Sequence, residues 1–216
     1  MLRIAVLGSG RGSNFQAILT AIQQGNVPGA RICLVISNNS GAGILDIARA
    51  NGLPAVHLSQ KQFPEEKSFA AAMLSMLRDH EVNFVVLAGY MKLVPRSVVA
   101  AFRNRMINIH PALLPRHGGE GMFGVHVHEA VITAGERESG ATVHYVDEEY
   151  DRGRIILQRK VPVLPDDTHA SLAARVLEIE HVLYPEALRR IAEEDSRESN
   201  GVVPHGAPGG SAHASH

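Results

Sequence analysis

The stretch Phe84-Val85-Val86-Leu87-Ala88 decides the fold of this chain, because it is apolar at every position. A strand with one face in water alternates apolar and polar residues, whereas a continuous apolar run is typical of a strand buried on both faces. Strands of that kind belong to parallel sheets that helices cover on both sides. We therefore expect this run to be a central strand of an α/β sheet.

The segments before this run alternate between short apolar stretches and helical patterns. The expected strands are Ile4 to Leu7, Ile32 to Ser37 and Ala55 to Leu58, and the expected helices are Ser13 to Gln24, Ile44 to Asn51 and Phe63 to Asp79. A repeated β-α-β order predicts a doubly wound, mostly parallel, Rossmann-like sheet with helices on both faces.

The pattern changes after Pro115, where a glycine-rich loop begins. The elements expected from there on are a helix from Val125 to Ala134, a late antiparallel hairpin of Ala141 to Val146 and Arg154 to Val161, and a long C-terminal helix from Thr168 to about Glu194. Residues 196–216 contain glycine, proline, serine and histidine but no aromatic side chain, which predicts a disordered tail. We therefore expect one domain, residues 1–195, followed by this tail.

Composition narrows the class of protein. With 216 residues, 45% of them hydrophobic and 20% charged, the chain suits a single domain with a sizeable core. Its net charge of -1 gives no sign of nucleic acid or of an anionic membrane as a partner. No apolar run approaches the roughly 20 residues that span a bilayer. Cys33 stands alone in an expected strand and is predicted to be a buried thiol. We expect a cytoplasmic protein, a monomer or homodimer, that binds small molecules.

The segment Asn108-Ile109-His110-Pro111 carries the most specific chemical signal. In an extended segment ending here, alternation sends the Asn108 amide and the His110 imidazole to the same face. Open α/β sheets bind their ligands at such strand ends, and Pro111 restrains the backbone of His110. The spacing leaves two interpretations open: an active site, or a buried histidine that caps a strand.

The loop Gly8-Ser9-Gly10-Arg11-Gly12-Ser13-Asn14 lies between the first expected strand and helix. Glycines let backbone N–H groups approach an anion, and the N-terminus of a helix favours negative charge. Ser13 and Asn14 add side-chain donors and are able to cap the helix. The loop lacks the third glycine of the Rossmann fingerprint and the lysine of a P-loop. It predicts a phosphate site, with a tight turn that binds nothing as the alternative.

Residues 147–153 form an acidic link between the two late strands. Acidic turns are usually solvated, but a carboxylate here would favour the charged form of His110 and orient its ring if it reached that side chain. Asp151 is the best candidate, because Gly153 permits a sharp bend beside it.

Three further histidines raise the question of a metal. His126 and His128 are two residues apart, so they do not share a helix face, and no carboxylate or cysteine completes a ligand set with them and His144. We expect no metal, and we expect one or two of these histidines to shape the wall of the active site.

Taken in order, these motifs resemble the phosphoribosylglycinamide formyltransferase family, the folate-dependent enzymes of purine synthesis. The resemblance covers about residues 1–190 and rests on Gly8 to Asn14, Ala88-Gly89-Tyr90-Met91, Asn108 to Pro115 and Asp151-Arg152-Gly153. It implies transfer of a formyl group from 10-formyltetrahydrofolate, the co-substrate, to the amine of 5′-phosphoribosylglycinamide, without a metal. Two alternatives stay open: a formyltetrahydrofolate hydrolase, and a nucleotide-binding module without catalysis.

The resemblance also implies a role for individual residues. Asn108 and His110 would face the formyl group, and Asp151 would raise the pKa of His110. The residues implied to bind phosphoribosylglycinamide are Gly12, Ser13 and Asn14 at the phosphate and Glu180 at the ribose. The residues implied to bind folate are Met91, Lys92, Leu93, Val94, Asn108 and Asp147. Leu177 stands where a polar phosphate contact would be expected, which leaves Arg175 or the glycine-rich loop alone to hold the phosphate.

Overall fold

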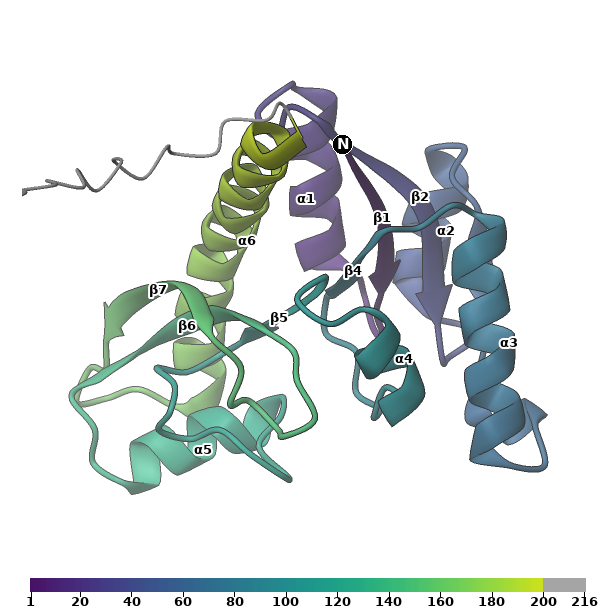
Figure 1. The fold of residues 1–216 in the computed structure, drawn as a ribbon. Coiled ribbons are helices and arrows are strands. Elements are labelled where there is room, and N and C mark those ends of the chain that lie inside the picture. The colour runs from purple at the N-terminus through teal and green to yellow at the C-terminus, as the bar shows by residue number, and fades with distance from the viewer. Residues whose placement is uncertain (200–216) are drawn as a thin grey trace, which may run out of the picture.

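The computed structural model describes residues 1–199, which form a seven-stranded sheet in the order β3-β2-β1-β4-β5-β6-β7 (Figure 1). The strands are β1 (Leu2–Leu7), β2 (Ala30–Ser37), β3 (Ala55–His57), β4 (Phe84–Leu87), β5 (Met106–His110), β6 (Glu138–Tyr145) and β7 (Ile155–Pro162). The strands from β3 to β5 are parallel, whereas β6 runs antiparallel to both β5 and β7. The predicted fold class is confirmed.

Helices cover both faces of the sheet. They are α1 (Ser13–Gln23), α2 (Gly43–Ala50), α3 (Glu66–Asp79), α4 (Arg96–Ala101), α5 (Val125–Thr133) and α6 (His169–Ser199), with a short 3-10 helix at Gln60–Gln62. One core lies between the sheet and α1, α2, α5 and α6, and the other lies between the sheet and α3 and α4. This explains why the central strand β4 is apolar throughout: Phe84 and Val86 face the first core, while Val85 and Leu87 face the second.

The same alternation places the polar residues of β5. Ile107 and Ile109 face the first core, and Met106 packs in the second core with Val98 and Val99 of α4. Asn108 and His110 share the face of Met106, since they follow it at intervals of two residues. They lie at the carboxyl end of β5, the edge at which open α/β sheets bind ligands.

The structure differs from the sequence prediction in several elements; α3, for example, begins at Glu66 rather than at Phe63, and β1 and β2 each begin two residues earlier than expected. The helix α4 was not expected, because six residues are too few to display a helical period. The strand β6 begins at Glu138 rather than at Ala141. The helix α6 continues to Ser199, so residues 196–199 are helical where a tail was expected. The rest of the predicted tail, residues 200–216, lies outside the described residues. Cys33 is a buried free thiol, as predicted.

None of the helices within residues 1–199 is both long enough and apolar enough to cross a bilayer. The longest, α6, instead packs against the sheet through fully buried residues such as Leu188 and Tyr184. The hydroxyl of Tyr184 donates to the backbone oxygen of Leu87 at 2.9 Å and lies 3.3 Å from that of Ile107. This hydroxyl therefore ties α6 to the two strands whose ends carry the polar residues.

Replacing Tyr184 by phenylalanine is expected to lower the free energy of unfolding by about 1–2 kcal/mol, because two buried carbonyl groups lose a donor. Urea denaturation measures this change. Tyr90→Phe is the matched control, since the buried hydroxyl of Tyr90 has no hydrogen-bond partner within residues 1–199 and its loss should cost little. Equal losses in the two variants would contradict this account of the α6 anchor.

Candidate active site

A cavity of about 1180 Å³ opens at the carboxyl ends of β4 and β5. This is the edge at which open α/β sheets bind ligands, and the volume is ample for more than a drug-sized molecule. Its wall contains Asn14, Met91, Lys92, Leu93, Val94, Asn108, His110, Asp147, Asp151 and Glu180. Sequence reasoning named all of these, so the fold brings them together from widely separated segments. Gly12 and Ser13 are not part of the wall, and Ser13 instead lines a groove between α1 and α6.

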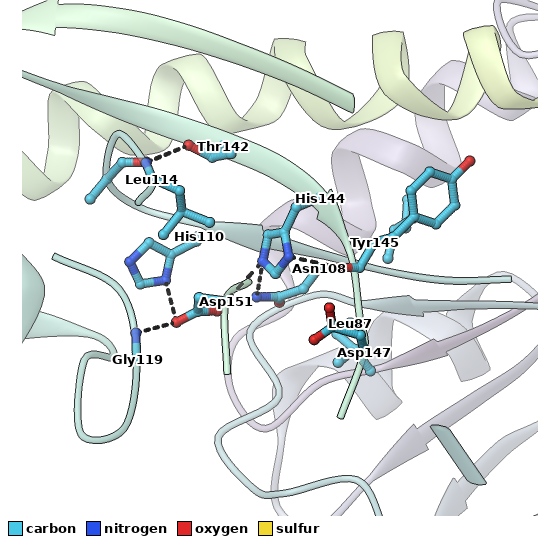
Figure 2. A network of polar contacts seen from close by, with 12 residues as sticks. Leu87, Asn108, His110, Leu114, Gly119, Thr142, His144, Tyr145, Asp147 and Asp151 are labelled. Atoms are coloured by element: carbon cyan, nitrogen blue, oxygen red, sulfur yellow. Dashed lines mark hydrogen bonds and ion pairs between the residues drawn. The ribbon is translucent and has the colours of Figure 1, made fainter. Parts of the chain in front are cut away.

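Four polar side chains form a connected network at the centre of this wall (Figure 2). Asp151 Oδ2 lies 3.5 Å from His110 Nδ1, and Asp151 Oδ1 lies 3.5 Å from Nε2 of His144. The same His144 nitrogen lies 3.3 Å from Nδ2 of Asn108. The pairing of β5 with β6 explains this arrangement, because it sets Asn108 directly opposite His144 and His110 opposite Thr142.

The turn that follows His110 is held against β6. The hydroxyl of Thr142 donates to the carbonyl of Ala112 at 2.6 Å. It also accepts from the N–H of Leu114 at 3.1 Å (Figure 2). A buried hydroxyl that both donates and accepts leaves little freedom to the backbone it joins. Thr142 therefore limits movement of the segment that presents His110.

His110 is 3% exposed, and its Nε2 donates to the carbonyl of His117 at 2.8 Å. A carbonyl only accepts, so the proton sits on Nε2 and the neutral ring turns an unprotonated Nδ1 toward Asp151. Burial lowers the pKa of His110, and the Asp151 carboxylate acts in the opposite direction. The expected influence of Asp151 is present, but the pKa is lowered rather than raised because burial outweighs it.

Asp151 is held as a carboxylate. Burial by itself would raise its pKa, yet the hydrogen bond with His144, the nearby His110 and the N–H of Gly119 bring the pKa below its usual range. The backbone of Asp151 is left-handed, with φ of 53°. At Gly153 an added Cβ would collide with the carbonyl of Tyr145, so only glycine lets the loop turn back onto β6. The bend thus requires the glycine at position 153.

His144 is a candidate functional residue that sequence reasoning did not assign to the network. It is 2% exposed, and its Nδ1 donates to the carbonyl of Tyr145 at 2.9 Å. The neutral ring therefore accepts from the Asn108 amide through Nε2, whereas the protonated ring would donate to Asp151. The sequence indicated that His144 shares a strand face with Thr142, two residues before it. It did not indicate that this strand pairs with β5.

The other two histidines considered for a metal site, His126 and His128, differ in their exposure to solvent. His126 is exposed and lies 3.5 Å from Glu129, outside the cavity wall. His128 is buried in the wall, and burial lowers its pKa to about 4. Of the three histidines, His128 and His144 therefore line the cavity. Within residues 1–199 no group of three or more histidine, cysteine or acidic side chains is arranged to hold a metal ion.

The glycine-rich loop joins β1 to α1. Gly12 precedes the first residue of α1 with φ of 85°, and an added Cβ would lie 2.8 Å from Cα of Ile44. The glycine is thus required by the turn and by the approach of α2. The expectation that Ser13 or Asn14 caps the helix is wrong, since no side chain makes the cap hydrogen bond. Arg11, which sequence reasoning did not single out, lines the cavity.

Asn14 is instead committed to Glu180. Its Nδ2 donates to Glu180 Oε2 at 2.6 Å, and both side chains are buried. Burial raises the pKa of Glu180 to about 7, against the opposing effect of this hydrogen bond. The buried Oδ1 of Asn14 has no partner within residues 1–199. The pair therefore offers unfilled acceptor capacity beside the cavity, which suits a ligand that carries hydroxyl groups.

Of the two possible phosphate ligands, Arg175 is already engaged. Its guanidinium binds both carboxylate oxygens of Asp167, at 2.6 and 2.9 Å, and it is not part of the cavity wall. Leu177 lines the cavity but has no polar group to offer. Of the glycine-rich loop, Arg11 and Asn14 line the cavity.

Comparison with known proteins identifies the family of this chain. The sequence profile of the formyl transferase family matches residues 2–188. A protein of Vigna unguiculata named phosphoribosylglycinamide formyltransferase, chloroplastic, is 47% identical over 193 residues, which are 89% of this chain but 61% of that protein. The chain thus spans less than two thirds of this relative. The phosphoribosylglycinamide formyltransferase of Haemophilus influenzae is 38% identical over 89% of this chain and 88% of its own.

A solved structure gives the same result. The crystal structure of glycinamide ribonucleotide transformylase 1 from Symbiobacterium toebii is 42% identical, with a TM-score of 0.84 over 90% of this chain and 89% of that one. The chain belongs to the formyl transferase family. This family uses formyltetrahydrofolate as its formyl donor.

The raised pKa of Glu180 predicts a measurable pH dependence of stability. From pH 4.5 to about 7 the folded protein retains a proton that the unfolded chain has lost. The contribution of Glu180 to the free energy of unfolding should therefore fall by up to about 3 kcal/mol as pH rises through this window, while the lowered pKa values of His110 and His128 act in the opposite direction. The fall should appear as a shrinking difference in stability between the wild type and Glu180→Gln. Urea denaturation at several pH values measures it. Glu178→Gln, an exposed change on the same helix, is the control and should leave the fall in place.

Proposed function

We propose that this protein transfers a formyl group from 10-formyltetrahydrofolate to the amine of 5′-phosphoribosylglycinamide, a step of purine biosynthesis. One observation carries the proposal: Asn108, His110 and Asp151 meet in the same cavity as the buried pair Asn14 and Glu180. A reactive cluster beside a hydroxyl-binding pair suits a reaction between a ribose derivative and a second bound molecule. The names of the relatives support the same activity.

The two substrates would divide the cavity between them. The backbone N–H groups of Gly12, Ser13 and Asn14 would hold the phosphate at the start of α1, where Arg11 and Asn14 line the cavity. Glu180 would accept hydrogen bonds from the ribose hydroxyls. The other part of the wall would take the folate, through residues that combine apolar surface with backbone polar groups. These residues are Met91, Lys92, Leu93, Val94, Asn108 and Asp147.

The reaction forms a bond between the amine nitrogen and the formyl carbon, and it breaks the bond from that carbon to folate N10. Negative charge develops on the formyl oxygen, where the Asn108 amide would donate a hydrogen bond; a donor of this kind is commonly worth about 3 kcal/mol. The amine must lose a proton and N10 must gain one. Proton transfer is therefore the second requirement of the site.

His110 is suited to move this proton. Its lowered pKa keeps the ring neutral at neutral pH, and its Nε2 is committed to the carbonyl of His117. The proton would then be accepted at Nδ1, next to the Asp151 carboxylate, which stabilises the imidazolium that forms. The ring would afterwards return the proton to N10, so no net charge is left on the protein.

Other expectations remain proposals about this chain. We propose a cytoplasmic protein, in line with its lone buried thiol, that binds small molecules rather than nucleic acid or membranes. A monomer or a homodimer is compatible with these properties.

The activity is tested by mixing purified protein with 10-formyltetrahydrofolate in the presence and absence of 5′-phosphoribosylglycinamide. Folate release that depends on the acceptor is the expected result, followed by absorbance. Release with water alone would identify a hydrolase, and binding without release in either mixture would identify a module without catalysis. Either of these outcomes would overturn the proposal.

The role of Asp151 gives a separate prediction. Asp151→Asn removes the charge that raises the pKa of His110, so that pKa should fall further and the acidic limb of the profile of kcat/KM against pH should move to lower pH. The maximal rate should fall by about a hundredfold, because the imidazolium loses its counter-charge. Glu129→Gln, at an exposed acid of α5, is the control. An unmoved acidic limb in Asp151→Asn would show that the two groups are not coupled.

A further inference from the structure

A second glycine-rich loop, residues 116–124, contacts His110 and Asp151 through its backbone. These two residues are the proposed catalytic pair. The carbonyl of His117 accepts from Nε2 of His110 at 2.8 Å. The N–H of Gly119 donates to Asp151 Oδ2 at 2.9 Å (Figure 2). Movement of this loop would therefore remove one hydrogen bond from each member of the pair. The first of these bonds is also the one that commits Nε2 and leaves Nδ1 to accept a proton.

The backbone at this point is not in a conformation that it would adopt freely. His117 has φ of 54°, in the left-handed region that only a few per cent of non-glycine residues occupy. Such a conformation persists where surrounding contacts hold it. The contacts that hold His117 are thus part of what orients His110.

Both carboxylate oxygens of Glu136 bind this part of the loop. Glu136 Oε2 accepts from Nη1 of Arg116 at 2.7 Å, and Oε1 lies 3.2 Å from Nε2 of His117. Glu136 lies in the turn between α5 and β6, so it belongs to a different part of the chain from the loop. One side chain thereby holds two consecutive residues, the second of which supplies the carbonyl bonded to His110.

We propose that Glu136 is a positioning residue of the transfer reaction: it binds Arg116 and His117, and so keeps the His117 carbonyl bonded to Nε2 of His110. The inference rests on the proposed function of His110. None of residues 116, 117 and 136 lines the cavity, so Glu136 acts through the loop rather than on a substrate. Loss of the Glu136 carboxylate would leave the His110 ring in place but free to turn.

Glu136→Ala tests this role against Glu138→Ala. Glu138 is the matched control because it lies two residues further along, is half exposed, and forms one ion pair with Lys160 at 2.7 Å. With Glu136→Ala, kcat should fall about tenfold to a hundredfold while KM for either substrate changes little, since the reacting groups lose their alignment. Glu138→Ala should retain wild-type kcat, and Glu136→Gln, which keeps one acceptor, should be intermediate. Equal kcat values for the two alanine variants would overturn the proposal.

A second readout follows His110 directly. In ¹⁵N-histidine-labelled protein, the Nε2–H signal of His110 is assigned by its absence from His110→Asn. It should be protected from exchange in the wild type and in Glu138→Ala, and broadened or lost in Glu136→Ala. A protected signal in Glu136→Ala would overturn the proposal even if kcat had fallen, and so would a lost signal with unchanged kcat.

The two readouts separate this proposal from the proposed function. If the wild type transferred no formyl group to 5′-phosphoribosylglycinamide, the function would be wrong. A protected His110 signal in Glu136→Ala would instead show, with or without turnover, that Glu136 does not orient the ring.

Discussion

The antiparallel pairing of β5 with β6 is the contact on which the site depends. It aligns Asn108 with His144 and His110 with Thr142, so four polar side chains share one face of the sheet. The residues that alternate with them on the two strands point to the opposite face of the sheet, where Ile107, Ile109 and Val143 are buried in the core. A shift of one residue in this register would send the polar group into the core and expose the apolar one. The core therefore protects the geometry of the site.

Burial is the largest influence on the pKa values of most titratable groups in the cavity, and charged or hydrogen-bonding neighbours oppose it. Burial lowers the pKa of His110 despite Asp151, and it raises the pKa of Glu180 to about 7 despite Asn14. Asp151 is the exception, because its hydrogen bonds and nearby histidines outweigh burial and keep it ionised. Titratable groups with pKa values moved in opposite directions are the usual property of sites that transfer protons at neutral pH.

Much of the fold was predictable from the chain alone, for reasons that particular segments make clear. The unbroken apolar run of β4 predicted a buried parallel strand, and the intervals of two residues in β5 predicted that Asn108 and His110 share a face. The segment around α4 was not predictable, because six residues after Pro95 show no period. The end of α6 was placed too early, since residues 196–199 have no apolar pattern to mark them as helix.

By itself, then, the sequence determined which residues are candidates for the chemistry and which strand ends present them, because alternation and turn preferences act over a few neighbouring residues. Only the tertiary structure decided that Asn14 binds Glu180 instead of capping α1, that His144 joins Asn108 to Asp151, and that burial lowers the pKa of His110. These features depend on contacts between segments far apart in the chain and on the water excluded there. Neither the long-range contacts nor the exclusion of water can be predicted from local sequence patterns.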